Sequence, residues 1–300
     1  MNPMVSYFFL YWNPYGDKKF IEPRFVQAVE SLYRNCDPAI SKEVFVICQG
    51  NPESTQETVR GLRKTYGFQL VELTKNIGLS AGINMGFNLS RGKYMAMFSQ
   101  DVMMTKGCDT NVIRYMETDP NIMHVVPVSD KSDYPHQQCP VREPFGSDVV
   151  DIGRVQAIKG RPRMGAVCVE ISLNYFSREI LNTVGYFDER WKGCYECADY
   201  GVRTAMAGKA VIVSYESFIW HHLHTCSDYI GKLEIYADYL QGDPFADDRV
   251  GKLMWDKWSP TIRDESRWYS PGSMDEGRRQ GLLSKYKQHI YLPFNQDRKY

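Results

Sequence analysis

Apolar runs and amphipathic stretches alternate along the first hundred residues of the chain. Four apolar runs have the length of buried strands, at residues 5–11, 44–48, 68–73 and 94–99. Three stretches between them repeat apolar residues at helical spacing, at residues 23–35, 55–66 and 79–89. Strands that alternate with helices are typical of βαβ units. The pattern therefore predicts an α/β fold with a Rossmann-like, mainly parallel central sheet and flanking helices.

The second half of the chain has a weaker pattern. Residues 125–163 show little periodicity and contain five prolines, which indicates a long excursion across the surface. Further elements are expected as strands at 166–171, 210–215 and 218–222, helices at 180–184 and 199–206, and helical pieces at 233–240 and 249–258. The chain thus divides into a domain at residues 1–228 and a C-terminal helical extension at residues 229–300.

The charge balance excludes a global attraction to nucleic acid or to an anionic membrane. Lys and Arg total 36 and Asp and Glu total 36, so the formal net charge is zero. The first apolar run, of about eight residues, is too short for a signal peptide or a membrane span. The eight cysteines do not form the dense framework of a small secreted scaffold. We therefore expect no transmembrane segment, mostly reduced thiols and a cytoplasmic location.

A carboxylate follows the fourth apolar run. Residues 94–99 end in Ser99, and Gln100 and Asp101 come next. Polar residues directly after a buried strand lie at the carboxyl edge of the sheet, where open α/β folds bind their ligands. Asp101 is therefore expected to meet a ligand, while its alternative role is to cap the turn after the strand.

Two ordered blocks of sequence carry a family resemblance. The first reads NIGLSAGINMG at residues 76–86, then RGKY at 91–94 and the strand that leads to Asp101. The second reads VGYFDE at 184–189 and ECADYGVR at 196–203, followed by Ala207-Gly208 and His222. Together they resemble inverting family 2 glycosyltransferases of the A-type fold, in the branch of rhamnosyl- and galactofuranosyl-type transferases. The resemblance runs from about residue 5 to 227, with a weaker echo at Lys257 and Trp258.

The resemblance implies transfer of a sugar from a nucleotide-linked donor to a hydroxyl acceptor such as a glycan. Residues 1–101 would bind the nucleotide sugar and residues 102–228 the acceptor. A divalent cation, Mn²⁺ or Mg²⁺, would neutralise the departing diphosphate through oxygen ligands. By resemblance, Asp101 would be a metal ligand and His222 its partner, although His221 and His224 lie in the same stretch. The sugar, the acceptor and the oligomeric state are not specified by these motifs.

The position of the catalytic base departs from the family pattern. The family uses the second acid of a Glu-Asp pair, and that pair aligns with Glu196 and Cys197. Because a thiol stands at the expected base position, Glu196 or Asp199 is expected to deprotonate the acceptor hydroxyl. Asp199 has an alternative role as a helix cap or first-turn acid.

Donor recognition in the family comes from the ends of the first two strands and from the Asn-rich block. An aromatic face can stack on a nucleobase and an amide can bond to its edge. The second strand ends in Cys48 and Gln49 where the family has an acid, and a glutamine can still hydrogen-bond uracil or thymine, so the expected donor is a UDP- or dTDP-sugar. The predicted donor-binding residues are Trp12, Asn13, Gln49, Asn76, Ser80, Asn84, Ser99 and Gln100.

Two alternatives remain open from the sequence. The missing acids at Ser99, Cys48 and Cys197 are compatible with a non-catalytic relative that binds a nucleotide or a glycan. Alternatively, the protein is an interaction protein that a closed zinc site stabilises. Residues of the types that bind zinc are present at Cys194, Cys197, His221, His222, His224 and Cys226.

Overall fold

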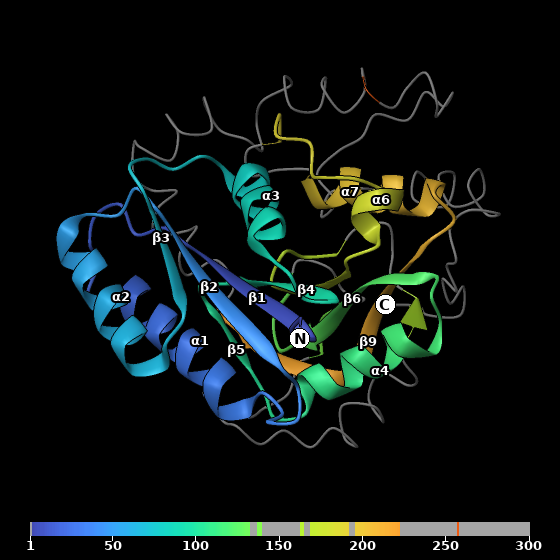
Figure 1. Ribbon diagram of the computed structural model, residues 1–300, viewed down its shortest axis with the longest axis horizontal. Helices are drawn as coiled ribbons and strands as arrows, with labels where there is room; N and C mark the ends of the chain where they lie inside the picture. The colour runs from blue at the N-terminus through green and yellow to red at the C-terminus, as the bar shows by residue number, and fades with distance from the viewer. Residues whose placement is uncertain are drawn as a thin grey trace.

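The strands of the protein form one mixed sheet with helices on both faces, as the computed structural model shows (Figure 1). The structure describes residues 2–132, 137–139, 163–164, 169–191, 196–222 and 257. Its strands are β1 (Val5–Tyr11), β2 (Lys42–Gln49), β3 (Gln69–Leu73), β4 (Tyr94–Ser99), β5 (Val102–Met104), β6 (Ile122–Ser129), β7 (Arg163–Met164), β8 (Leu173–Ser177) and β9 (Ala210–His221). Its helices are α1 (Ile21–Asn35), α2 (Glu53–Tyr66), α3 (Leu79–Leu89), α4 (Cys108–Thr118), α6 (Ile180–Thr183) and α7 (Glu196–Met206).

The sheet has a parallel half and a mixed half. Its order is β3-β2-β1-β4-β8-β6-β9-β5, and β7 pairs with β9. Strands β3, β2, β1 and β4 are parallel to one another, as the sequence predicts. Beyond β4 the pairs β4–β8, β6–β8 and β5–β9 are antiparallel and β6–β9 is parallel. The mainly parallel prediction thus holds for the first half only.

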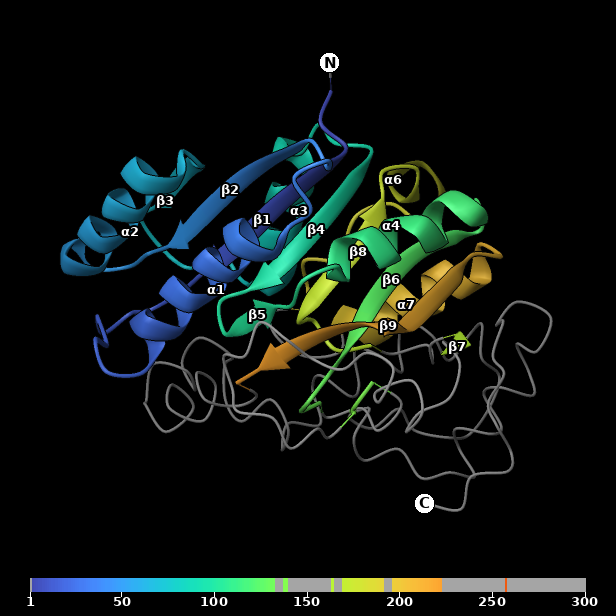
Figure 2. The ribbon, with the colours of Figure 1, turned by 90° about the horizontal axis from the view of Figure 1, so that it is seen from below.

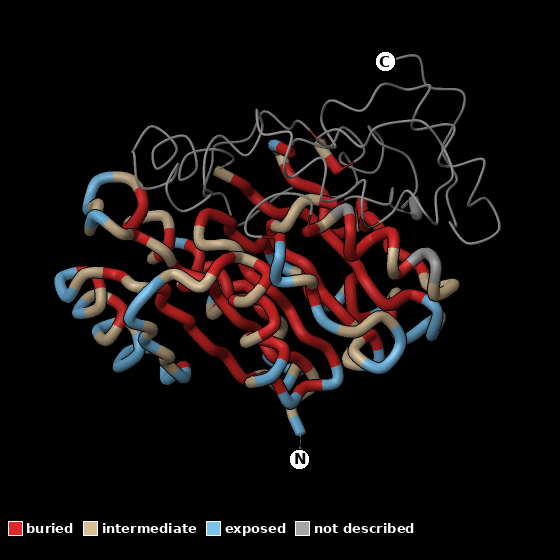
Figure 3. Tube along the Cα trace, turned by 90° about the horizontal axis from the view of Figure 1, so that it is seen from above, coloured by how far each residue is buried: buried red, intermediate tan, exposed pale blue. Residues whose placement is uncertain are grey.

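Alternating residues of the central strand pack against two separate cores. In β1, Tyr7 and Phe9 face the core under α1 and α4, whereas Phe8 and Leu10 face the core under α3, α6 and α7. Figure 2 shows α1 and α4 on the same side of the sheet, and Figure 3 shows the strands buried in the middle of the molecule. Because both faces are covered, β1 is apolar at nearly every position, which is typical of a strand in a doubly covered sheet.

Several elements of the second half differ from the sequence predictions. Of the strand expected at 166–171, residues 169–171 are not in a strand and residues 166–168 lie outside the described residues. Strand β8 at Leu173–Ser177 was not predicted, because buried Asn174 interrupts the apolar pattern. The surface excursion expected from residue 125 begins inside strand β6. This strand accommodates Pro127 because the β6–β9 ladder shifts register there. The two strands expected at 210–215 and 218–222 are one strand, β9, and β5 and α4 were not predicted. The helical extension at 229–300 lies outside the described residues except for Lys257.

Candidate active site

The ends of three strands bring the candidate residues together. Strand β1 ends just before Trp12, and β4 ends just before Gln100 and Asp101. Strand β9 ends at His221, opposite Val102 of β5, and the His222 amide donates to the Asp101 carbonyl at 3.0 Å. This arrangement agrees with the crevice predicted at the carboxyl edge of the sheet.

Gln100 joins the tips of β1 and β4. Its Oε1 accepts from the Trp12 amide at 2.7 Å, and its Nε2 donates to the Trp12 carbonyl at 3.2 Å. The side-chain amide therefore continues the β1–β4 ladder one step beyond its backbone end. Both polar groups of Gln100 are occupied by this contact, so its contact with a donor stays a prediction.

Asp101 lies in a small network of buried charges. Its Oδ1 accepts from the Ser99 hydroxyl at 2.7 Å and lies 3.7 Å from Nε2 of His221. The other ring nitrogen of His221 lies 3.5 Å from Oε2 of Glu170, and its backbone amide donates to Asp130 at 2.8 Å. The structure thus places the His221 ring, one of the three histidines considered from the sequence, beside the Asp101 carboxylate. The role of His222 as a metal ligand stays a prediction.

Opposing effects set the charge of this network. Burial by itself would lower the pKa of His221, but the neighbouring carboxylates of Asp101 and Glu170 raise the pKa to about 10. Burial by itself would raise the pKa of Asp101, but the neighbouring His221 and the hydrogen bond from Ser99 outweigh it and lower the pKa. The imidazole of His221 is therefore a cation at neutral pH, and it lies against an ionised Asp101.

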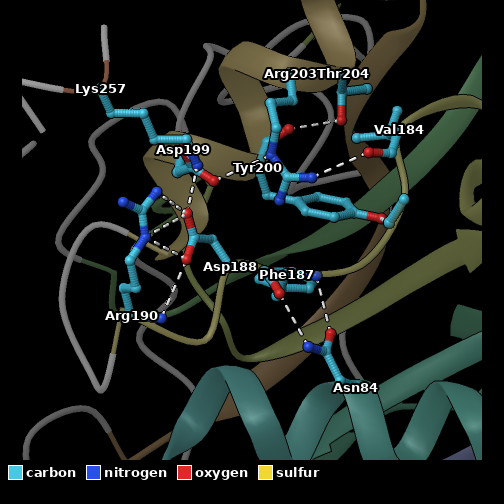
Figure 4. A network of polar contacts seen from close by, with 11 residues as sticks. Asn84, Val184, Phe187, Asp188, Arg190, Asp199, Tyr200, Arg203, Thr204 and Lys257 are labelled. Carbon is cyan, nitrogen blue, oxygen red and sulfur yellow. Dashed lines mark hydrogen bonds and ion pairs between the residues drawn. The ribbon is translucent and has the colours of Figure 1, made fainter.

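The two candidate bases on α7 lie in different surroundings. Glu196 is 6% exposed, and its Oε2 has no hydrogen-bond partner. Burial raises the pKa of this carboxyl to about 7, the range in which a general base works best at neutral pH. Asp199 is completely buried and ionically paired on both oxygens, with Arg203 Nε at 3.0 Å and Lys257 Nζ at 2.6 Å (Figure 4).

Besides Ser99 and Gln100, four of the predicted donor residues have polar groups bonded within the protein. Asn13 is completely buried and closes the β1–α1 connection through Asp17, while Gln49 accepts from the Ile77 amide at 3.3 Å. Asn76 accepts from the Gly78 amide at 2.8 Å, which shapes the entry into α3. Asn84 exchanges two hydrogen bonds of 2.9 Å with the Phe187 backbone. These hydrogen bonds give the four side chains a structural role. Their direct contact with a donor stays a prediction.

Ser80 differs from these residues. It lies in the first turn of α3, is completely buried, and its hydroxyl has no hydrogen-bond partner. A buried hydroxyl without a partner is costly in a folded protein. Ser80 is therefore a donor-binding candidate whose polar group is not already used, although its contact with a donor is also a prediction.

The described residues do not support the zinc alternative. Among them, no group of three or more His, Cys, Asp or Glu side chains could hold a metal ion. Cys197 is a half-buried cysteine on α7. The other proposed ligands Cys194, His224 and Cys226 lie outside the described residues.

The sequence comparison points to one family. Residues 18–154 match the model described as Glycosyl transferase family 2. This segment is similar to family 2 glycosyltransferases. No curated protein matches the sequence. The match supports the predicted family over these residues, whereas the rhamnosyl- and galactofuranosyl-type branch and the inverting mechanism stay predictions.

Solved glycosyltransferase structures share the fold of this protein. The mannosyltransferase PcManGT from Pyrobaculum calidifontis, in complex with GDP-Man and Mn²⁺, has a TM-score of 0.59 at 16% identity, over 94% of this chain and 69% of its own. GalNAc-T7 with UDP, GalNAc and Mn²⁺ has a TM-score of 0.57 at 12% identity, over 95% of this chain and 55% of its own. TarS of S. aureus has a TM-score of 0.53 at 12% identity, over 96% and 49%. The chain thus spans about half the length of the last two, and the predicted A-type glycosyltransferase fold is confirmed.

Two charged residues of the site were missed by sequence reasoning. Glu170 and Asp130 both hold His221, yet Glu170 precedes an unpredicted strand and Asp130 directly follows β6. Asp130 is an acidic residue directly after the apolar run of β6. An acidic residue directly after a buried strand is also the signal that predicted Asp101. Glu170 had no such signal because its place depends on how the second half of the sheet pairs.

Proposed function

We propose that the protein is an inverting glycosyltransferase that moves a sugar from a UDP- or dTDP-linked donor to a hydroxyl acceptor. The match to family 2 glycosyltransferases supports glycosyl transfer as the reaction class. The observation that carries the mechanism is the buried Glu196 carboxyl at the start of α7, whose Oε2 has no partner. A single carboxylate is sufficient as the base for a direct displacement, in which the acceptor attacks opposite the leaving group.

Glu196 is the better candidate for the base because its proton-accepting capacity is not already used. Both oxygens of Asp199 are already paired with cations, Arg203 and Lys257. In the proposed step the acceptor oxygen loses its proton to Glu196 and bonds to the anomeric carbon. The bond from that carbon to the nucleotide diphosphate breaks at the same time, so the anomeric configuration inverts.

The donor would lie along the tips of β1 and β4, between the nucleobase end at Trp12 and the diphosphate end at Asp101. Half-buried Trp12 offers a ring for stacking, and Ser80 offers a hydroxyl without a partner at the N-terminus of α3. Helix N-termini favour phosphate groups. One structural neighbour is a complex with GDP-Man and another with UDP, so both purine and pyrimidine nucleotides belong in the test.

The residues at Asp101 fit a divalent cation that the substrate shares. Mg²⁺ and similar ions are often held by one or two carboxylates together with substrate phosphates. Asp101 would supply the carboxylate and the neutral His222 ring a second ligand, because burial and the nearby Arg24 lower the pKa of His222 to about 3. When bound, Mn²⁺ or Mg²⁺ would neutralise the departing diphosphate. Among the residues that the structure describes, His221 supplies a further positive charge beside Asp101.

The remaining parts of the proposal concern the whole chain. Residues 1–101 would bind the donor, residues 102–228 the acceptor, which is a glycan or another hydroxyl compound, and residues 229–300 would form an extension of the catalytic domain. Among the described helices, none combines the length and apolar content needed to cross a bilayer. The cytoplasmic location stays a prediction.

The test is a calorimetric titration of UDP, dTDP and GDP with and without Mn²⁺, followed by assays of sugar release from the donors of whichever nucleotide binds. We expect binding that depends on Mn²⁺ and is lost in Asp101→Ala but kept in Glu57→Ala, a change of an exposed carboxylate on α2. Nucleotide binding without sugar release or transfer would support the non-catalytic alternative. Absence of binding by all three nucleotides would refute the proposal.

A further inference from the structure

Lys257 contacts two parts of the candidate active site at once. Its Nζ lies 2.7 Å from Oδ2 of Asp188 and 2.6 Å from Oδ1 of Asp199. It comes from the predicted C-terminal extension, whereas Asp188 lies within the VGYFDE block and Asp199 lies on α7. The side chain of Lys257 is only 19% exposed, so these ion pairs are largely shielded from solvent.

Each of the two carboxylates also binds an arginine that is close to it in the sequence. Arg190 donates to both oxygens of Asp188, and this contact, together with Lys257, holds the pKa of Asp188 well below its ordinary value. Arg203 binds Asp199 one helical turn away and donates to the Val184 carbonyl at 3.0 Å. These bonds fix the direction of both carboxylates toward the Lys257 ammonium (Figure 4).

The same segment is bonded to the helix on the donor side. Asn84 of α3 pairs with the backbone of Phe187, the residue before Asp188. A continuous set of polar contacts thus runs from α3 through Phe187 and Asp188 to Lys257, and from there to Asp199 on α7 (Figure 4). Asp199, the last residue of this set, lies three residues after Glu196 and on the same side of the helix.

We propose that Lys257 is a positioning residue that holds α7, and with it the Glu196 carboxyl, against the 184–191 segment and α3. The inference rests on the proposed function of Glu196 as the base. It makes Lys257, which lies far from α7 along the chain, part of the catalytic unit. Without the Lys257 ammonium, the completely buried Asp199 keeps only Arg203 among the two cations described for it, so the first turn of α7 loses its tie to Asp188.

The test compares four full-length proteins: the wild type, Lys257→Met, Lys257→Arg and the control Lys93→Met. Lys93 also forms a short ion pair, with Glu117 at 2.6 Å, but it is 57% exposed and lies at the opposite end of β4 from Asp101. Hydrogen exchange read by mass spectrometry reports on residues 184–191 and 196–206 without any substrate. Nucleotide affinity is measured with UDP, dTDP and GDP, and kcat with the donor found in the experiment above.

We expect faster exchange in both segments for Lys257→Met, no change in β1 and β2, and recovery in Lys257→Arg, which keeps the positive charge. We expect a fall in kcat of about 100-fold, because small displacements of a reacting group have effects of that size. Nucleotide affinity should stay within about threefold, because the nucleotide site is formed by other strands. The control Lys93→Met should match the wild type in all three measurements.

Unchanged exchange in residues 196–206 would overturn the inference whatever the activity. Faster exchange with an unchanged kcat would overturn the positioning role, and equal loss in Lys257→Arg would overturn the role of the charge. If Lys257→Met does not fold, Asp188→Asn removes one of the two pairs while leaving Lys257 with Asp199, and the same results are expected in reduced size. If the wild type binds nucleotide but transfers no sugar, the proposed function fails, and the exchange measurement still decides whether Lys257 holds α7 in place.

Discussion

At the scale of single residues, environment separates side chains that are alike in the sequence. Glu196 and Asp199 are two acids in the first turn of one helix, and sequence reasoning left both open as the base. The structure leaves one oxygen of Glu196 without a partner and gives Asp199 two cations. The partner Lys257 is 58 positions away along the chain (257 minus 199), so no local pattern could have made this distinction.

The first prediction concerns Glu196→Gln. The amide keeps the shape of the side chain but cannot accept the proton, so kcat should fall by a factor of about 10² to 10⁴ with donor affinity nearly unchanged. Wild-type kcat should also rise with pH through about 7, because the carboxyl must be ionised to act as a base. A pH series of initial rates checks both, and a wild-type profile that is flat from pH 5.5 to 8.5 would contradict the assignment.

At the scale of elements, the first half of the sheet was predictable because each segment repeats a strong local pattern. Strands β1 and β4 and helix α3 have the predicted bounds, since their apolar periods are uninterrupted. Strand β8 was missed because Asn174 is buried and bonds to the Glu170 carbonyl and to His124, which no periodicity reveals. Strand β6 was missed because a proline normally argues against a strand interior.

The packing of α3 on β1 depends on a glycine. A Cβ at Gly86 would overlap the ring of Phe8, one of the largest completely buried side chains. We predict that Gly86→Ala lowers the free energy of unfolding by about 1–3 kcal/mol, because the core must move to admit one methyl group.

Gly61→Ala is the matched control for Gly86→Ala. Gly61 is exposed within α2, and a Cβ there would meet nothing within 4 Å. The substitution should raise stability by about 0.5–1 kcal/mol through helix propensity. Urea unfolding of the two variants measures the difference, and equal effects on stability would show that α3 does not pack as closely as described.

At the scale of the whole molecule, the two halves of the sheet meet at a buried charged group. His221 ends β9 in the second half and lies between Asp101 of the first half and Glu170 of the second. The sequence identified Asp101 from a local signal, but which histidine lies against it depends on how β9 pairs with β5. The pairing of distant strands was therefore the part of the site that sequence reasoning could not supply.

This contact makes global stability depend on pH. The pKa of His221 is raised to about 10 in the folded state from an ordinary value of 6.5. Its stabilising contribution is therefore complete below pH of about 6.5 and is lost as pH rises through about 10. We predict that, between pH 7 and 10 and in the absence of metal, the melting temperature of the wild type falls more steeply than that of His221→Asn. Parallel curves for the two proteins would refute the assigned contact.

The side-chain bridge from Gln100 to the Trp12 peptide has a consequence for donor selection. Because one amide ties the end of β1 to the residue beside Asp101, the spacing between the Trp12 backbone and Asp101 is set by a rigid connection and not by a loop. In the proposed arrangement this spacing must match the length of the donor from nucleobase to diphosphate. The fixed distance between the strand tips would then favour nucleoside diphosphate sugars over nucleoside monophosphate sugars, because the two kinds of donor differ in length.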